Sequence, residues 1–212
     1  WAENPENGVI SPLHIDMGIT TGCNLACHFC FGVVQARHGF QGKQGRMLFM
    51  SKDVIKKVFS DAKEMGVRSI ALIGEGENTI NPALYPSLMH ARDIKLDVSL
   101  ATHGASLRPQ HYETLLTSCV WVRFNISAAT EDSYKLIHQR PWLNKVIDNA
   151  EKMMNLREQK SLVHFSGDAT TLGFQMVVTK QNMNDVIPLS KLARDAGVDY
   201  LVVKACSDTP ER

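Results

Sequence analysis

The sequence has no segment that would anchor it in a membrane or direct it across one. It contains no run of about 18 apolar residues, which excludes a membrane-spanning helix. A basic start followed by an apolar core and a small-residue cleavage site is also missing. We therefore expect a cytoplasmic protein with no membrane partner.

The chain also has little net charge. Its 23 basic and 22 acidic side chains are spread along the sequence and give a formal net charge of +1. Proteins that bind long phosphate backbones carry clustered positive charge. A nucleic-acid partner is therefore unsupported.

Length and composition predict one domain. A chain of 212 residues, of which 44% are apolar, can bury one sizeable core. The sequence begins at Trp1 without Met and stops soon after the last predicted strand. We expect residues 1–212 to form a single core domain that is a fragment of a longer protein.

Apolar, β-rich runs recur along the chain and alternate with helical patterns. The six predicted strands are Leu13–Ile19, Ser69–Ile73, Asp97–Ala101, Val120–Ile126, Gly173–Val178 and Tyr200–Lys204. Predicted helices follow the N-cap Ser51, the pairs Asn81-Pro82 and Arg108-Pro109, Trp142 and Asn184. The first of them ends at Gly66 and places on one face Val54, Ile55, Val58, Phe59, Ala62 and Met65.

Strands that alternate with helices form a parallel sheet with right-handed crossovers, and functional groups gather at the C-terminal strand ends. Six such units predict an α/β fold, a partial (β/α)6 barrel of the TIM type, with an open α/β sheet as the alternative. Two connections, 31–50 and 161–171, are unusually long. Loops of that length are usually lids, binding loops or disordered segments.

Three of the five cysteines follow the first predicted strand in a C-x3-C-x2-C spacing, as Cys23, Cys27 and Cys30. An odd number of cysteines, with three so close together, suits metal ligation better than a disulfide framework. Three thiolates in one loop can hold one face of a cubane iron–sulfur cluster and leave the fourth iron open. The alternatives are three unrelated buried cysteines or a zinc site, for which His28 is the available fourth ligand.

This spacing after a first strand, with the aromatic Phe29 before the last cysteine, resembles the signature of the radical SAM superfamily. The resemblance covers nearly the whole chain. It implies that the three cysteines bind a [4Fe-4S] cluster and that Phe29 lies beside the cofactors. The open iron would chelate S-adenosylmethionine (SAM), and reductive cleavage would yield a 5′-deoxyadenosyl radical that abstracts hydrogen. The low potential required implies a flavodoxin- or ferredoxin-like electron donor.

A glycine-rich turn with two acids follows the second strand, from Gly74 to Thr79. Most such turns are only turns, and this one lacks the G-x-G-x-x-G fingerprint of dinucleotide sites. In the family this place holds a Gly-Gly-Glu-Pro-like motif that binds the SAM amino group. Gly76 and Glu77 match its centre, whereas Glu75 and Asn78 depart from it.

The third and fourth strand ends supply further candidates by resemblance. Thr102 and His103 resemble part of the family's Thr-Asn-Gly, although His103 is explained equally well as a structural polar residue. On the fourth strand, alternation places Arg123, Asn125 and Ser127 on one face. Ser127 resembles the family's serine that contacts the SAM carboxylate or ribose, and Asn125 is the second choice.

Other candidates follow from position alone. Arg140 could pair with the methionine carboxylate of SAM or be a solvated surface residue. Gln175 and Lys204, on the fifth and sixth strands, could approach the adenine. Cys206 could be a hydrogen donor, a ligand of a second cluster or an inert residue, and Cys119 should be structural.

The sequence leaves the substrate open. Residues 177–182 and 197–204 resemble radical SAM members that carry a further C-terminal domain and modify peptides or small metabolites. The first hypothesis is maturation of a peptide or protein, and the alternative is a sugar, nucleoside or other small metabolite. A non-catalytic zinc- or cluster-binding scaffold is the alternative of another class. An open groove beside the 31–50 loop would favour a peptide, and a closed polar pocket a metabolite.

Overall fold

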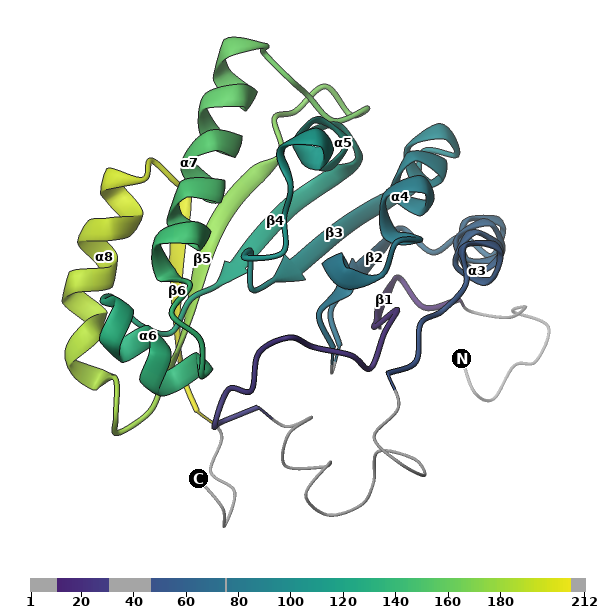
Figure 1. The fold of residues 1–212 in the computed structure, drawn as a ribbon. Helices are drawn as coiled ribbons and strands as arrows, with labels where there is room; N and C mark the ends of the chain where they lie inside the picture. The colour runs from purple at the N-terminus through teal and green to yellow at the C-terminus, as the bar shows by residue number, and fades with distance from the viewer. Residues whose placement is uncertain (1–10, 31–46, 75, 207–212) are drawn as a thin grey trace, which may run out of the picture.

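Six parallel strands form one sheet in the computed structural model, which describes residues 11–30, 47–74 and 76–206. Their order in the sheet is their order in the chain, β1 to β6, and Figure 1 shows the curved sheet that results. The predicted α/β fold and partial (β/α)6 barrel are confirmed. The strands are β1 (His14–Met17), β2 (Ser69–Leu72), β3 (Asp97–Thr102), β4 (Cys119–Asn125), β5 (Thr171–Val178) and β6 (Tyr200–Ala205).

Helices pack along the outer side of this sheet (Figure 1). They are α3 (Lys52–Glu64), α4 (Leu84–Asp93), α5 (Tyr112–Ser118), α6 (Glu131–His138), α7 (Leu143–Gln159) and α8 (Val186–Asp195). None of the helices described is long and apolar enough to cross a membrane.

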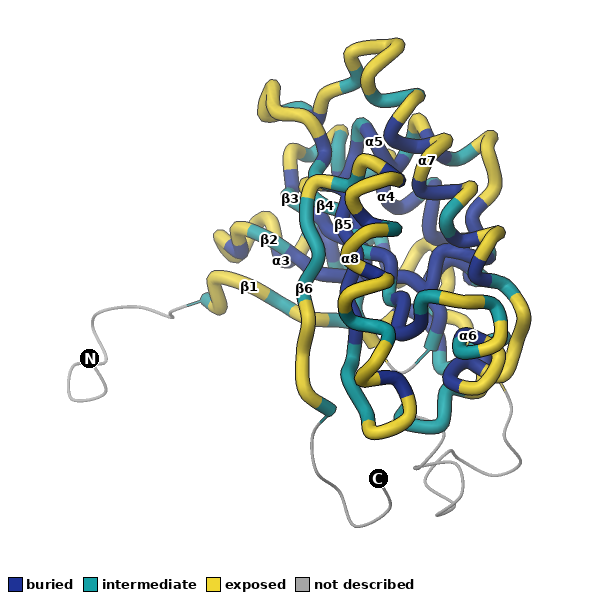
Figure 2. Tube along the Cα trace, turned by 90° about the vertical axis from the view of Figure 1, so that its left-hand side faces the viewer, coloured by how far each residue is buried: buried dark blue, intermediate teal, exposed yellow. Residues whose placement is uncertain are grey.

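The core lies between the sheet and these helices, where Figure 2 shows the buried parts of the trace. Phe124 and Phe174 on neighbouring strands are fully buried, and their ring centroids lie 6.0 Å apart in an edge-on arrangement. Gly104 has a positive φ of 79°, and a Cβ there would lie 2.4 Å from the Phe124 ring. Only glycine fits this close packing after β3.

The predicted face of the first helix is partly wrong. Ile55, Phe59 and Ala62 of α3 are buried, but Val54 and Met65 are 49% and 55% exposed. Residues 54 and 65 lie at the edge of the apolar stripe, because each residue advances about 100° around a helix. The Ser51 cap is confirmed, since its Oγ accepts a hydrogen bond from Val54 N at 3.4 Å.

Several elements also differ from the prediction. β1 is shorter than 13–19, and Leu13 is exposed. α4 begins at Leu84, because the Asn81 side chain caps Ala83 N and also donates to two carbonyls outside the helix. α6 was not predicted, although Thr130 and Ser133 form a reciprocal capping box at its start.

Truncating Phe59 should destabilise the fold far more than truncating Val54. Phe59→Ala removes a fully buried ring and should lower the free energy of unfolding by about 3–5 kcal/mol. Val54→Ala, on the same helix but half exposed, should change it by less than about 0.5 kcal/mol. Urea denaturation followed by circular dichroism measures both, and equal losses would contradict the observed helix face.

Candidate functional site

The three clustered cysteines lie in a loop that runs across the C-terminal strand ends from β1 toward α6 (Figure 1). Cys23, Cys27 and Cys30 are all partly exposed. The loop turns back on itself between the last two, where Cys30 N donates to Cys27 O at 3.0 Å. The predicted metal-binding loop is therefore at the end of the sheet where functional groups gather.

The turn after β2 holds the beginning of this loop. Glu77 N donates to Gly22 O at 2.7 Å. A Cβ on Gly76 would lie 2.4 Å from Thr20 O and 2.5 Å from Gly22 O. Glycine at position 76 is thus required for the two backbones to approach, which supplies a reason for the predicted Gly-Glu pair. Glu75 lies outside the described residues.

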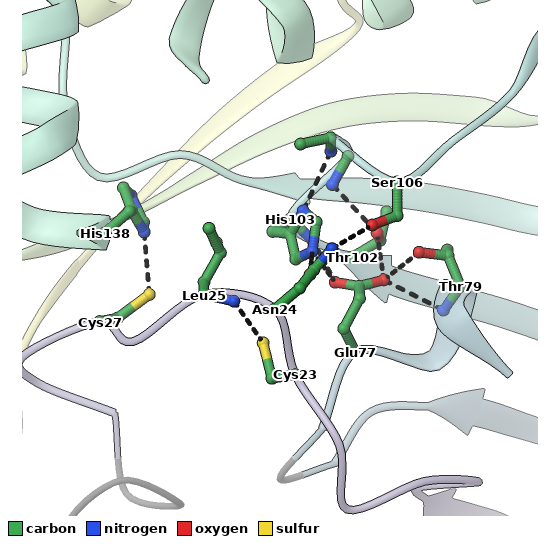
Figure 3. A network of polar contacts seen from close by, with 12 residues as sticks. Cys23, Asn24, Leu25, Cys27, Glu77, Thr79, Thr102, His103, Ser106 and His138 are labelled. Carbon is green, nitrogen blue, oxygen red and sulfur yellow. Dashed lines mark hydrogen bonds and ion pairs between the residues drawn. The ribbon is translucent and has the colours of Figure 1, made fainter. Parts of the chain in front are cut away.

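The Glu77 carboxylate joins the β2 turn to the end of β3. It is 4% exposed and accepts from four donors: Thr79 N, Thr79 Oγ1, Thr102 Oγ1 and His103 N, at 3.1, 2.6, 2.6 and 2.8 Å. Figure 3 shows these contacts converging on one side chain. A buried carboxylate is tolerated when donors surround it, so Glu77 fixes the turn geometry.

His103 extends this network to the middle of the cysteine loop. Its Nδ1 accepts from Ala105 N at 3.0 Å, so the other ring nitrogen, Nε2, carries the proton. Nε2 donates to Asn24 Oδ1 at 2.7 Å, and Asn24 Nδ2 donates to Ser106 Oγ at 2.9 Å (Figure 3). Of the two residues predicted as cofactor contacts, His103 thus holds the loop by a side-chain hydrogen bond, whereas the Thr102 hydroxyl donates to Glu77.

The end of α6 holds the second half of the loop. The carbonyl oxygens of Ile137 and His138 accept from His28 N at 3.2 Å and from Ala26 N at 3.4 Å. The last carbonyls of a helix have no partner within the helix. At α6 the cysteine loop donates to two of these carbonyls. The loop is therefore held by three separate elements: the β2 turn, the end of β3 and the end of α6.

His138 also reaches one of the cysteines. Its Nδ1 lies 3.0 Å from Cys27 Sγ (Figure 3). Its Nε2 accepts from Ser127 N at 3.1 Å. Burial, with lesser contributions from His103 and His28, lowers the pKa of His138 to about 3. The ring is therefore neutral, and sequence reasoning did not identify it.

The cysteine thiols fit a site where metal replaces their protons. Burial raises the pKa of Cys23 to about 11, and it raises the pKa of Cys27 still further. Lesser contributions from Glu77 and from the Cys30 thiol raise the pKa of both residues, and Cys23 also raises that of Cys27. Metal ligation offsets the free-energy cost of deprotonating these buried thiols, because a bound metal stabilises thiolates. Among the described residues, no three His, Cys, Asp or Glu side chains are grouped closely enough to hold a metal ion.

Three predicted residues lie on β4, just after it and on β5. Gln175 Nε2 donates to Asn125 Oδ1 at 3.3 Å, while Gln175 Oε1 is buried and has no hydrogen-bond partner among the described residues. Ser127 is 1% exposed, and its Oγ accepts from Val177 N at 3.1 Å. Ser127 thus joins the two strands, and its backbone N–H orients His138.

Arg140 and Lys204 lie apart from these networks, whereas Phe29 lies beside His138. Arg140 is exposed, and its guanidinium lies 5.9 Å from the centroid of the Trp142 ring. Lys204 is exposed near the end of β6, opposite Val177. Phe29 is half-buried, with its ring 6.1 Å from that of His138 in an edge-on arrangement. Cys119 is fully buried at the start of β4, as predicted for a structural residue.

The principal residues that sequence reasoning missed are Asn24 and His138. Asn24 lies between two cysteines of the motif and was not considered as a separate residue. A polar side chain within a metal-binding loop nevertheless indicates that a hydrogen bond holds the loop. His138 is the last residue of α6, a helix that was not predicted, and its partner Cys27 is 111 positions away in the chain. Only the fold brings them together.

Two hollows open near the cysteine loop. The first, of about 420 Å³, is lined by Gly18–Thr21, Leu48–Met50 and Gly74. Segment 48–50 pairs with the end of the β1 region there, since Met50 N donates to Ile19 O at 2.9 Å. The second, of about 640 Å³, lies between α4, the β3–α5 loop and the start of α7, and Asn24, Arg108, His111 and Lys145 are among its lining residues.

Adding a methyl group at Gly76 should displace the cysteine loop. In Gly76→Ala the new Cβ meets two backbone oxygens at less than 3 Å, which no side-chain rotation relieves. Iron and sulfide bound after anaerobic reconstitution should fall several-fold, with the far-ultraviolet circular dichroism retained. Gly22→Ala is the control, because its Cβ meets only the flexible Met47 side chain. Equal metal content in Gly76→Ala and the unsubstituted protein would refute this role.

Solved structures with a similar fold include Streptococcus suis SuiB bound to S-adenosylmethionine, with a TM-score of 0.74 and 18% identity. The match covers 96% of this chain and 43% of that one. Another is anSMEcpe with bound AdoMet, with a TM-score of 0.64, 18% identity and coverage of 93% and 53%. At this level of identity, the likeness concerns the fold.

Relatives that match in sequence include the following two. A probable GTP 3′,8-cyclase of Saccharolobus islandicus (strain M.14.25 / Kamchatka #1) is 25% identical over 184 residues, 86% of this chain and 53% of the relative. A tungsten-containing aldehyde ferredoxin oxidoreductase cofactor-modifying protein of Pyrococcus furiosus is 21% identical over 194 residues, 90% of this chain and 50% of the relative. The chain thus spans about half the length of these relatives.

One protein-family model, described as the radical SAM superfamily, matches residues 17–165, which is more than half of the chain. The matched range includes the cysteine loop, the Glu77 turn and α6. Its members are enzymes that use a [4Fe-4S] cluster and S-adenosylmethionine, as the sequence resemblance implied. The chain belongs to the radical SAM superfamily.

Proposed function

We propose that Cys23, Cys27 and Cys30 each ligate one iron of a [4Fe-4S] cluster and that SAM binds the fourth iron. The observation that carries this proposal is the position of the loop. One short loop at the C-terminal strand ends bears all three cysteines, and three separate elements hold that loop. When bound, cluster and SAM together supply one-electron cleavage of the sulfonium and a radical that abstracts hydrogen from a substrate.

The chain's own residues then have distinct roles. We propose that Gly76 lets the β2 turn present backbone groups to the SAM amino group, while the Glu77 carboxylate holds that turn. Asn125 and Gln175 are assigned to the nucleoside part of SAM, since the free Gln175 Oε1 is a buried acceptor that needs a donor. Ser127 is assigned to holding β4 against β5.

Arg140 and Lys204 are less well supported as SAM contacts. Both are exposed, and among the described residues no hydrogen bond or ion pair joins either of them to the Glu77 network. A guanidinium that packs over Trp142 could still reach a carboxylate from the loop before α7. We retain both as candidates and rank them below Asn125 and Gln175.

A peptide or protein is the substrate that we propose first. The hollow beside the cysteine loop is apolar and open to solvent, and Leu48 and Phe49 at its rim are 61% and 48% exposed. Exposed apolar side chains at a groove favour an extended chain over a small polar molecule. Structures of similar fold include SuiB bound to precursor peptide SuiA and anSMEcpe with AdoMet and a peptide, which supports this choice.

An anionic small metabolite is the second candidate. The larger hollow is lined by Arg108, Lys145 and His111, and the His111 ring stacks on Tyr85 at 3.6 Å. Cationic groups and a ring stack suit a phosphorylated or carboxylated metabolite. The probable GTP 3′,8-cyclases among the relatives support this alternative.

We further propose that a flavodoxin- or ferredoxin-like protein delivers the electron. Iron–sulfur potentials extend down to about −700 mV, and reduction of a sulfonium needs the low end of that range. Three cysteine thiols that must remain reduced fit a reducing compartment, for which the cytoplasm is our proposal.

Removing one cysteine of the loop should abolish the reaction. Cys27→Ala should lose cluster binding and form no 5′-deoxyadenosine with SAM and dithionite under anaerobic conditions, because one iron loses its ligand. Cys119→Ala is the matched control, since Cys119 is fully buried at the opposite end of β4. It should retain both properties. Retention of both by Cys27→Ala would refute the ligand assignment, as would the same losses in Cys119→Ala.

The two substrate classes can be separated by isotope transfer. Cells that express the gene are grown in deuterated medium, and their peptide and small-molecule fractions are incubated separately with enzyme and SAM. The peptide fraction should introduce deuterium into 5′-deoxyadenosine. Leu48→Asp should reduce this transfer several-fold, and Arg108→Ala should not. Transfer from the small-molecule fraction alone, reduced by Arg108→Ala, would favour the metabolite instead.

A further inference from the structure

We propose that His138 is a positioning residue that sets the reduction potential of the cluster by donating a hydrogen bond from Nδ1 to Cys27 Sγ. This inference rests on the proposed ligation by Cys27. It concerns a residue outside the cysteine motif, and the contact is made by the last turn of α6. Groups that hydrogen-bond to the ligands of a metal change its properties, and hydrogen bonds to the sulfurs help to set the potential of an iron–sulfur cluster.

The direction of the hydrogen bond follows from the backbone. Ser127 N lies 3.1 Å from His138 Nε2, and a backbone N–H can only donate. Nε2 is therefore the acceptor, and the proton of the neutral ring is on Nδ1. Since Nδ1 lies 3.0 Å from Cys27 Sγ, that proton points at the sulfur.

The donor on the far side of the ring is itself fixed. Ser127 Oγ accepts from Val177 N at 3.1 Å, and Ser127 O accepts from Asn182 Nδ2 at 2.7 Å. Ser127 is thereby held between β4 and the region after β5. Its N–H does not turn away from the histidine, so the tautomer is set by the fold.

The ring is also held in place by its surroundings. His138 is 2% exposed, and the Tyr134 ring, one helical turn earlier, lies 4.2 Å from it. His138 O accepts from Ala26 N at 3.4 Å, which ties the same residue to the cysteine loop by its backbone. The contact between the end of α6 and the cysteine loop thus positions both the donor, His138 Nδ1, and the acceptor, Cys27 Sγ.

A donor at this position favours the reduced cluster. Reduction adds one negative charge, part of which resides on the thiolate sulfurs, and a hydrogen bond to sulfur stabilises that charge. The donor ring is 2% exposed, and a hydrogen bond is stronger where solvent does not compete for it. Cys23 has a backbone donor, Leu25 N at 3.4 Å, which no side-chain substitution removes. In the part of the chain that the structure describes, His138 is the side chain that contacts a sulfur of the loop, so we assign the adjustment of the potential to it.

Two substitutions of His138 distinguish the roles of its two ring nitrogens. In His138→Gln the amide lies where Nε2 was and can still accept from Ser127 N, but the donor to Cys27 is lost. In His138→Asn the amide nitrogen lies where Nδ1 was and can still donate to Cys27. Anaerobic redox titration of the reconstituted protein, followed by electron paramagnetic resonance, should give a more negative potential for His138→Gln and a potential near the original for His138→Asn.

Equal potentials in the Gln variant and the unsubstituted protein, each with a full complement of iron and sulfide, would overturn the inference. A more negative potential in the Asn variant than in the Gln variant would do the same. If the unsubstituted protein binds no cluster, or Cys27→Ala binds one normally, the proposed function itself fails. The two failures are therefore distinguishable.

A second measurement needs no variant. The unsubstituted protein is produced with ¹⁵N-labelled histidine, and its reduced cluster is examined by pulsed electron–nuclear double resonance. A hydrogen bond to Cys27 should couple the cluster spin to one imidazole nitrogen and one exchangeable proton. No coupling to labelled nitrogen in a fully reconstituted sample would overturn the inference, even if the variants did not fold.

Discussion

The site depends on one constraint, which is that a short loop of three cysteines must be held still at the open end of a barrel. Backbone hydrogen bonds tie the loop to the β2 turn and to the end of α6, and side-chain hydrogen bonds from Asn24 tie it to His103 and Ser106. Each tie comes from a different βα unit. Correct packing of the sheet therefore also puts the thiols in place.

This coupling explains why so many polar groups are buried at the strand ends. Glu77 lies among four donors, and His103 and His138 each have a tautomer fixed by a backbone N–H. A buried polar group without a partner in such a network lowers the stability of the fold, whereas a network in which every group is paired is rigid. Rigidity of this kind suits radical chemistry, in which the protein orients the cofactors and excludes water while the cofactors carry out the difficult step.

Much of the fold could be predicted from the sequence, because strand and helix patterns are local. The six strands and the position of the cysteine loop follow from apolar periodicity and from the C-x3-C-x2-C spacing. The boundary of α4 could not, because Asn81 bonds to Ile19 O and Met50 O, which are distant in sequence. His138 was missed for the same reason, since its role depends on Cys27 and Ser127 at once. The SAM contacts of Gly76, Asn125 and Gln175 stay predictions.

The central claim is that the cysteine loop carries a [4Fe-4S] cluster whose open iron binds SAM. Electron paramagnetic resonance of the anaerobically reconstituted and reduced protein, recorded with and without SAM, tests it most directly. The account predicts a signal of a reduced [4Fe-4S] cluster whose g-values and line shape change when SAM is added. An iron-free protein, or a cluster signal that SAM leaves unchanged, would contradict it.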